Sequence, residues 1–227
     1  MRRPALGESS DLSQKAHRQL IGYLGLLLPV ILFGLAGSRP TTGLPRWDTL
    51  DSVSAYYYTG AVAAFVGVLF ALALFLFTYR GYKNDRADRV AGSAGGLFAL
   101  GVALFPTSPP GAVSAPSWWS PTTGTIHYVS AISLFIVFIV FSLWLFRKTN
   151  VPKGEPLPSD KLWRNRIYLI CGLVMVVGVL WAGTSFFTGA PIFWPETIAL
   201  SAFAASWLVK GYAYRPVVDV VRSALHR

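Results

Sequence analysis

The sequence has little charge for its length. Asp, Glu, Lys and Arg make up only 13% of its 227 residues, whereas a soluble globular domain carries about 25%. Hydrophobic residues make up 53%, and the mean hydropathy is +0.49. The charges cluster between long apolar runs, which is the pattern of a polytopic membrane protein and not of a soluble domain.

Cysteine and histidine are also scarce. The single cysteine, Cys171, excludes an intrachain disulfide, and its place within an apolar run indicates a small packing residue. His127 is the only histidine within or beside an apolar run. A zinc site usually needs three or four Cys, His or carboxylate ligands, and membrane haems commonly use paired histidines. We therefore expect neither a metal nor a cofactor, and no nucleotide-binding or G-x-S-x-G motif is present.

The net charge of +10 could suggest a nucleic-acid partner. A nucleic-acid surface, however, requires a basic face exposed to water. Here the basic residues flank the apolar runs, so we interpret them as setting the orientation in a bilayer. The partners expected from this pattern are membrane lipids, with no nucleic acid; the sequence does not indicate an oligomeric state.

Six apolar runs are candidates to cross a membrane, which takes about 20 residues of helix. They are residues 20–37, 56–79, 90–105, 126–146, 167–187 and 192–209. The sequence thus predicts an all-α polytopic membrane bundle of six transmembrane helices over 20–210. A cytoplasmic segment, 1–19, precedes it, and an amphipathic cytoplasmic tail, 211–227, follows. Run 90–105 is rich in glycine and alanine, which allow close backbone approach, so we expect it to be the central helix.

The basic residues are distributed asymmetrically. Of the 20 Lys and Arg residues, all but Arg39 and Arg46 lie in the N-terminal segment, in the loops after the second and fourth runs, or in the C-terminal tail. The positive-inside rule places these segments, and therefore both termini, in the cytoplasm. The expected location is a bacterial inner (plasma) membrane, which the chain crosses several times.

Polar residues gather at the predicted outer boundary. On a helix, Asp51, Ser54 and Tyr58 would share one face, and a second face would hold His127 and Ser130. The candidate ligand-binding residues there are Asp51, Ser54, Tyr57, Tyr58, His127, Ser130 and Glu196. Ionisable groups inside a membrane are costly and usually functional. We therefore predict an outward-facing polar pocket that binds a lipid or a small amphiphile.

Other interpretations of the same residues stay open. Asp51 and Glu196 occupy first-turn positions, where a carboxylate can simply cap a helix, and tyrosine is common at a membrane boundary. One functional alternative is a membrane-embedded, hydrolase-like enzyme that modifies lipid, with Ser54 or His127 in the chemistry. Another is a small transporter or proton-coupled permease that uses Glu196. The sequence does not decide whether any catalysis occurs.

A second group of polar residues lies at the predicted inner boundary. Its members are Lys83, Arg164, Asn165, Arg166 and Tyr168. They could hold an anionic lipid headgroup, or they could serve only as ordinary positive-inside anchors. Lys210, at the end of the sixth run, is interpreted as extending its amine toward the membrane surface.

Several short motifs together suggest a family. They are "SVSAYYYT", "YRGY" with "NDR", "LFP", "IHYVSA", "RNRIY" and "SWLVKG". With them the chain resembles an uncharacterised bacterial family of six-span integral membrane proteins, a domain of unknown function. Ser52 with Ser54, His127 to Ala131, and Pro195-Glu196 are also similar to features of the DRAM/Frag-type membrane proteins, although their order differs. Neither resemblance implies a reaction.

Overall fold

The structure is a computed structural model that describes residues 6–81, 85–111, 113–152 and 154–214. Its elements are α1 (Leu6–Ser38), η1 (Ser54–Tyr58), α2 (Val62–Thr78), α3 (Arg86–Leu104), α4 (Pro121–Leu143), η2 (Leu145–Arg147), α5 (Ser159–Thr188) and α6 (Phe193–Lys210), where η marks a short 3-10 helix. This described part of the chain contains no strand. The prediction of an all-α protein is confirmed.

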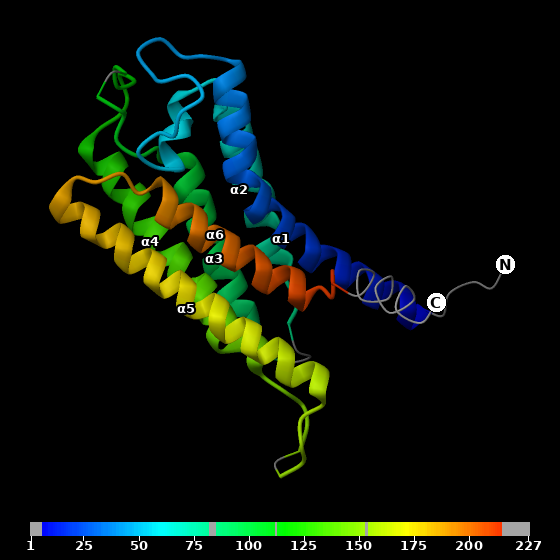
Figure 1. The fold of residues 1–227 in the computed structure, drawn as a ribbon. Coiled ribbons are helices and arrows are strands. Elements are labelled where there is room, and N and C mark those ends of the chain that lie inside the picture. The colour runs from blue at the N-terminus through cyan, green and yellow to red at the C-terminus, as the bar shows by residue number, and fades with distance from the viewer. Residues whose placement is uncertain (1–5, 82–84, 112, 153, 215–227) are drawn as a thin grey trace, which may run out of the picture.

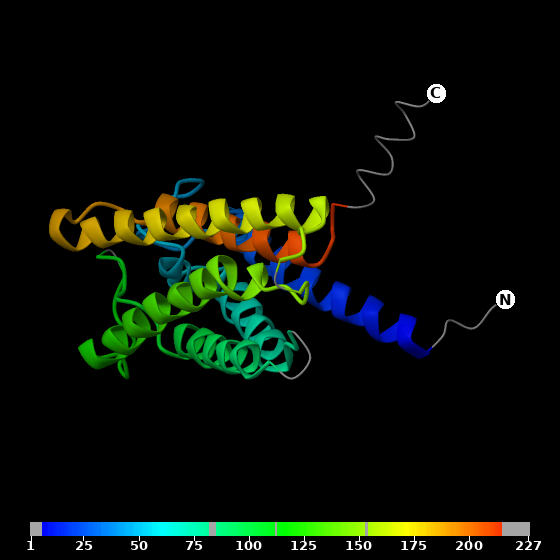
Figure 2. The same ribbon diagram turned by 90° about the horizontal axis from the view of Figure 1, so that it is seen from below.

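The six α-helices of the described residues form a closed ring in chain order. Each helix packs against the next along the chain, and α6 returns to pack against α1. In Figure 1 all six run roughly lengthwise along the molecule, and Figure 2 shows α5 and α6 side by side above α2, α3 and α4. The two ends of this bundle are therefore built from alternate loops.

Among the described residues, three helices are long and apolar enough to cross a membrane. They contain the segments Ser13–Ser38, Pro121–Arg147 and Ser159–Ser185. Helix α2 is strongly apolar but has 17 residues. Helix α3 begins with the charged residues Arg86, Asp88 and Arg89, and α6 has Glu196 in its first turn and Lys210 in its last, which shortens the apolar part of each helix.

The second predicted run begins later than expected. Tyr56 to Tyr58 belong to η1, and α2 starts only at Val62. Thr59 explains the break, because its hydroxyl donates to the Tyr56 carbonyl and accepts from the Ala61 N–H, so it takes groups that a continuous helix would use. The prediction that Asp51, Ser54 and Tyr58 share one face of an α-helix is therefore wrong.

The core is organised around α6 and not around the glycine-rich run 90–105. Phe203 and Trp207 on α6 are fully buried, and Phe203 stacks on Phe138 of α4 with ring centroids 3.7 Å apart. Helix α3 packs between α2 and α4, and at Gly92 its backbone meets the Leu76 carbonyl. Its small residues allow that close approach, as expected, but they supply little side-chain volume for a core.

Candidate functional site

A cavity of about 340 Å³ opens at one end of the bundle. We call this the basic end: α2, α4 and α6 finish there, and α3 and α5 begin there. Its lining consists of Arg18, Gly81, Thr149, Asn150, Val151, Pro158, Lys161, Arg164, Lys210 and Tyr212. Four of these residues are basic, and none of the described lining residues is acidic.

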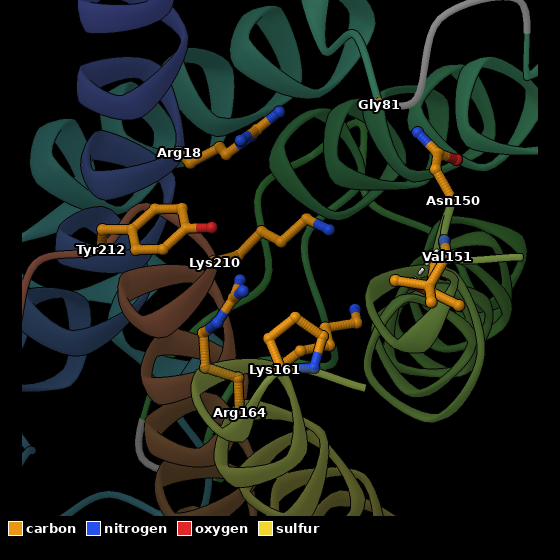
Figure 3. A pocket seen from close by; sticks show the side chains of 10 residues that line it. Arg18, Gly81, Asn150, Val151, Lys161, Arg164, Lys210 and Tyr212 are labelled. Atoms are coloured by element: carbon orange, nitrogen blue, oxygen red, sulfur yellow. Dashed lines mark hydrogen bonds between the residues drawn. The ribbon is translucent and has the colours of Figure 1, made fainter. Parts of the chain in front are cut away.

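The four basic side chains come from three helices. Arg18 lies on α1, Lys161 and Arg164 lie on α5, and Lys210 is the last residue of α6. The two α5 residues are three positions apart, so they share a face. Figure 3 shows Arg18, Arg164 and Lys210 approaching one space from different sides. The packing of α6 against both α1 and α5 is what brings them together.

Helix η2 holds the two lysines in place. The Lys161 amine donates a hydrogen bond of 2.9 Å to the Phe146 carbonyl. The Lys210 amine lies 5.1 Å from the centre of the Phe146 ring, within range of a cation–π interaction. Each lysine is only 7% exposed. Both amines are therefore kept at the cavity wall and do not extend freely into solvent.

The two arginines are held by other groups. Arg164 forms an ion pair of 3.0 Å with Asp160, and its guanidinium lies 4.6 Å from the centre of the Tyr212 ring. Tyr212 has a positive φ of 59° immediately after α6, a backbone turn that brings its ring over the cavity. Arg18 donates to the neutral side chain of Gln14 at 3.4 Å.

Polar contacts join the segments that surround the cavity. Asp85 accepts a 2.6 Å ion-paired hydrogen bond from Lys148 and also caps α3 by accepting from the Ala87 N–H. The Lys148 ammonium holds the pKa of Asp85 below its usual value. Gln19 donates to the Gly211 carbonyl at 2.8 Å. These contacts link the start of α3 to the residue that follows η2, and α1 to the end of α6.

The predicted inner residues are only partly gathered at this cavity. Arg164 lines it, whereas Arg166 is exposed outside the lining and Tyr168 is fully buried below, where its carbonyl accepts from Ser142. Asn165 is partly buried and is not a lining residue. Lys83 lies outside the described residues.

Sequence reasoning missed part of the lining. Arg18, Lys161 and Tyr212 were not proposed as site residues, and Lys210 was interpreted as reaching the membrane surface. The spacing of Lys161 and Arg164 was a usable signal, because residues three apart share a helix face. The approach of Arg18 to Lys210 depends on the packing of α1 against α6, which no local pattern encodes.

The opposite end of the bundle is where α2, α4 and α6 begin and α3 and α5 finish. There the Glu196 carboxylate accepts a 2.7 Å hydrogen bond from the Val53 N–H. The Ile192 N–H donates to the Asp51 carbonyl at 2.6 Å, while the Asp51 residue is exposed. Together these bonds attach the segment before η1 to the start of α6. Ser54 is buried within η1.

The other predicted outer residues contact the chain near the end of α3. His127 is 2% exposed, and its Nδ1 donates to the Phe105 carbonyl at 2.6 Å. The Tyr58 hydroxyl donates to the Thr107 carbonyl at 2.6 Å, and the Tyr57 ring packs edge-on against Tyr58.

Ser130 lies one helical turn from His127, and its hydroxyl lies against Gly101 of α3. Within the described part of the chain no hydrogen bond joins Glu196 to His127. The predicted outer residues thus form two groups, one at the start of α6 and one at the end of α3.

Comparisons with protein-family models, with curated proteins and with solved structures found no match.

Proposed function

We propose that this protein crosses a bacterial plasma membrane six times, with both termini in the cytoplasm. Helices α2, α3 and α6 have 17, 19 and 18 residues. At 1.5 Å per residue they would be roughly 26 to 29 Å long, close to the thickness of a bilayer core of about 30 Å. The ring of antiparallel neighbours and the concentration of Lys and Arg at one end support the same topology.

In this orientation the basic end binds the headgroup of an anionic lipid. The observation that carries this function is the cavity, whose described lining has four basic side chains and no acid. Arginine and lysine are the side chains that bind phosphate oxygens, through charge-assisted hydrogen bonds. The cytoplasmic leaflet is also the one that presents anionic lipids to such a site.

Exposed tryptophans support a position at headgroup depth. Trp163, beside Arg164 in sequence, is 45% exposed, and Trp144 at the end of α4 is 56% exposed. Tryptophan concentrates at the interface between the hydrocarbon core and water. The Lys148 amine lies 4.5 Å from the centre of the Trp144 ring, which adds a further cation at the same level.

An outward-facing pocket built on Glu196 and His127 has less support. Each of these side chains already makes a short hydrogen bond to a backbone group of its own chain. A ligand would have to replace those bonds. No observation favours lipid modification through Ser54 or His127, or transport through Glu196, over binding at the basic end.

The test is lipid retention by the purified protein. The full chain is extracted in mild detergent, and the lipids that co-purify are quantified by mass spectrometry against the lipids of the source membrane. We expect anionic lipids to be enriched. The double variant Lys161→Gln/Arg164→Gln should lose roughly tenfold of that enrichment, because two charge-assisted contacts are removed.

Arg89→Gln is the matched control. Arg89 is an exposed cation near the start of α3 that does not line the cavity. It removes one positive charge from the same end of the bundle and should leave retention unchanged. Retention by the double variant equal to that of wild type, or a bound-lipid composition equal to the source membrane, would disprove the proposed function.

A further inference from the structure

The cations around the cavity differ in how their charge is balanced. Among the described residues, Arg164 is paired with Asp160 at 3.0 Å. The acid whose charge acts on Lys210 is Asp88, which is 1% exposed and lies against Gly81 at the cavity; the cations Arg18 and Lys161 repel the same amine. These two cations therefore have acidic partners beside them.

Arg18 and Lys161 are balanced differently. The side-chain hydrogen bond of Arg18 goes to the neutral amide of Gln14. Lys161 donates to the neutral carbonyl of Phe146. The charges that act on it are those of the cations Arg164 and Arg147 and, more weakly, that of Asp160, whose carboxylate is already paired with Arg164. Once the two acids are assigned to Arg164 and Lys210, the described lining has two positive charges in excess.

The burial of this cluster makes the excess charge costly. Lys161, Arg164 and Lys210 are each less than 10% exposed. Repulsion between like charges is less screened there than on an open surface. A ligand with one negative charge would leave one of the two charges uncompensated, whereas a ligand with two would balance both.

We propose that the cavity selects a phosphomonoester, which is doubly charged, over a singly charged phosphodiester. This inference rests on the proposed function, because it assigns the class of headgroup that the same site takes. A phosphomonoester carries about −1.5 to −2 charges at pH 7 and offers three terminal oxygens. Three walls of the cavity can meet them: Arg18 on α1, Lys161 and Arg164 on α5, and Asn150 in the connector between α4 and α5.

The experiment compares headgroups of different charge on the full chain in mild detergent. Dihexanoyl phosphatidic acid, dihexanoyl phosphatidylglycerol and dihexanoyl phosphatidylcholine are titrated separately, and binding is followed by intrinsic tryptophan fluorescence. We expect phosphatidic acid to bind roughly tenfold more tightly than phosphatidylglycerol, as one extra buried charge interaction would give. Phosphatidylcholine, which has no net charge, should not bind measurably.

Two variants test the charge count itself. Lys161→Gln and Arg18→Gln each remove one of the two excess charges, from different helices. Either variant should bind phosphatidic acid and phosphatidylglycerol with affinities within about threefold of each other. Arg89→Gln is again the control and should keep the wild-type ratio. Because the two test variants act from separate helices, a folding defect in one leaves the other to decide.

The outcomes separate this inference from the proposed function. Equal binding of phosphatidic acid and phosphatidylglycerol by the wild type, with both lost in Lys161→Gln/Arg164→Gln, overturns the inference and keeps the lipid site. Binding of neither overturns the proposed function. Inorganic phosphate is a further arm: if it binds as tightly as phosphatidic acid, preference for a doubly charged phosphate stands, and the assignment to a lipid falls.

Discussion

The two ends of the bundle use polar residues in different ways. At the opposite end, Glu196 and His127 are hydrogen-bonded to the backbone groups of Val53 and Phe105. At the basic end, four cations surround a cavity, and within the described part of the chain two of them, Arg18 and Lys161, donate side-chain hydrogen bonds to neutral groups. A polar residue at the end of a helical bundle is thus a binding candidate when its charge faces a cavity uncompensated. When its side chain is already hydrogen-bonded to a backbone group, it instead holds two segments of the chain together.

Loop structure explains much of this difference. The opposite end includes two long segments, 39–61 and 105–120, and η1 is the one helix among their described residues. Segments without regular structure carry backbone N–H and C=O groups that need partners, and near a membrane water supplies fewer of them. Glu196, His127 and Tyr58 supply such partners. The basic end instead places charged side chains from the helices themselves around an open space.

Among substitutions that test the difference between the two ends, those of Glu196 should have the largest effect on stability. Glu196→Ala should lower the free energy of unfolding by roughly 2 kcal/mol, because the Val53 N–H loses its acceptor. Thermal unfolding in detergent, followed by tryptophan fluorescence, measures the change. Lipid retention at the basic end should not change. Glu196→Gln keeps an acceptor oxygen and should be closer to wild type; a stable Glu196→Gln protein that has lost its lipid would instead make the opposite end the site.

His127 should give a smaller effect of the same kind. In His127→Phe the ring volume is kept, but the Phe105 carbonyl loses its donor, which should cost roughly 1 kcal/mol of unfolding free energy. His127→Gln offers an amide N–H that can reach a carbonyl, so it should recover part of the loss. The same unfolding assay applies. If both variants kept wild-type stability and abolished binding of the anionic lipids, the fastening role would be refuted.

The fold follows from the sequence wherever long apolar runs decide the local structure. Residues 126–146 and 167–187 fall almost entirely within α4 with η2 and within α5, because about 20 apolar residues favour helix in a membrane environment. The start of α2 could not be placed in the same way. Tyr56 to Tyr58 look continuous with the apolar run, and the break depends on hydrogen bonds made by the single side chain of Thr59.

The candidate site was less accessible to sequence reasoning for a physical reason. The partner of Glu196 is the N–H of Val53, and a backbone N–H is present at almost every residue, so no residue type signals it. Arg18 and Lys210 come from opposite ends of the chain and meet only because α1 packs on α6. Only the Lys161 and Arg164 pair, three residues apart on α5, was visible as a local pattern.

Removing a cation from the basic end should raise the free energy of unfolding, whereas the substitutions of Glu196 and His127 should lower it. Lys161→Gln relieves repulsion from Arg164 and Arg147 and retains an N–H that can donate to the Phe146 carbonyl. In lipid-depleted detergent it should raise the free energy of unfolding by roughly 0.5 kcal/mol, while the stabilisation by added anionic lipid becomes smaller. The exposed Arg89→Gln should alter neither quantity. A Lys161→Gln protein less stable than wild type without lipid would show that this lysine is needed for the fold.

Substitution of Asp85 should have the smallest effect on stability. It tests whether a charged residue at the basic end can serve only to hold two segments together. Because Lys148 holds the pKa of Asp85 below its ordinary value, this ion pair stabilises the folded protein fully at neutral pH, and the contribution is lost as the pH falls through the folded-state pKa. Asp85→Asn should therefore lower the melting temperature slightly at pH 7, and the difference from wild type should vanish once the pH is low enough to protonate Asp85 in the folded protein. High salt should narrow the difference at pH 7, since the pair is solvent-accessible. Asp85 lies at the basic end, yet its ion pair with Lys148 holds two segments together, as the hydrogen bond of Glu196 to Val53 does at the opposite end. If Asp85→Asn weakened lipid binding as much as Lys161→Gln, proximity to the cavity would matter more than uncompensated charge.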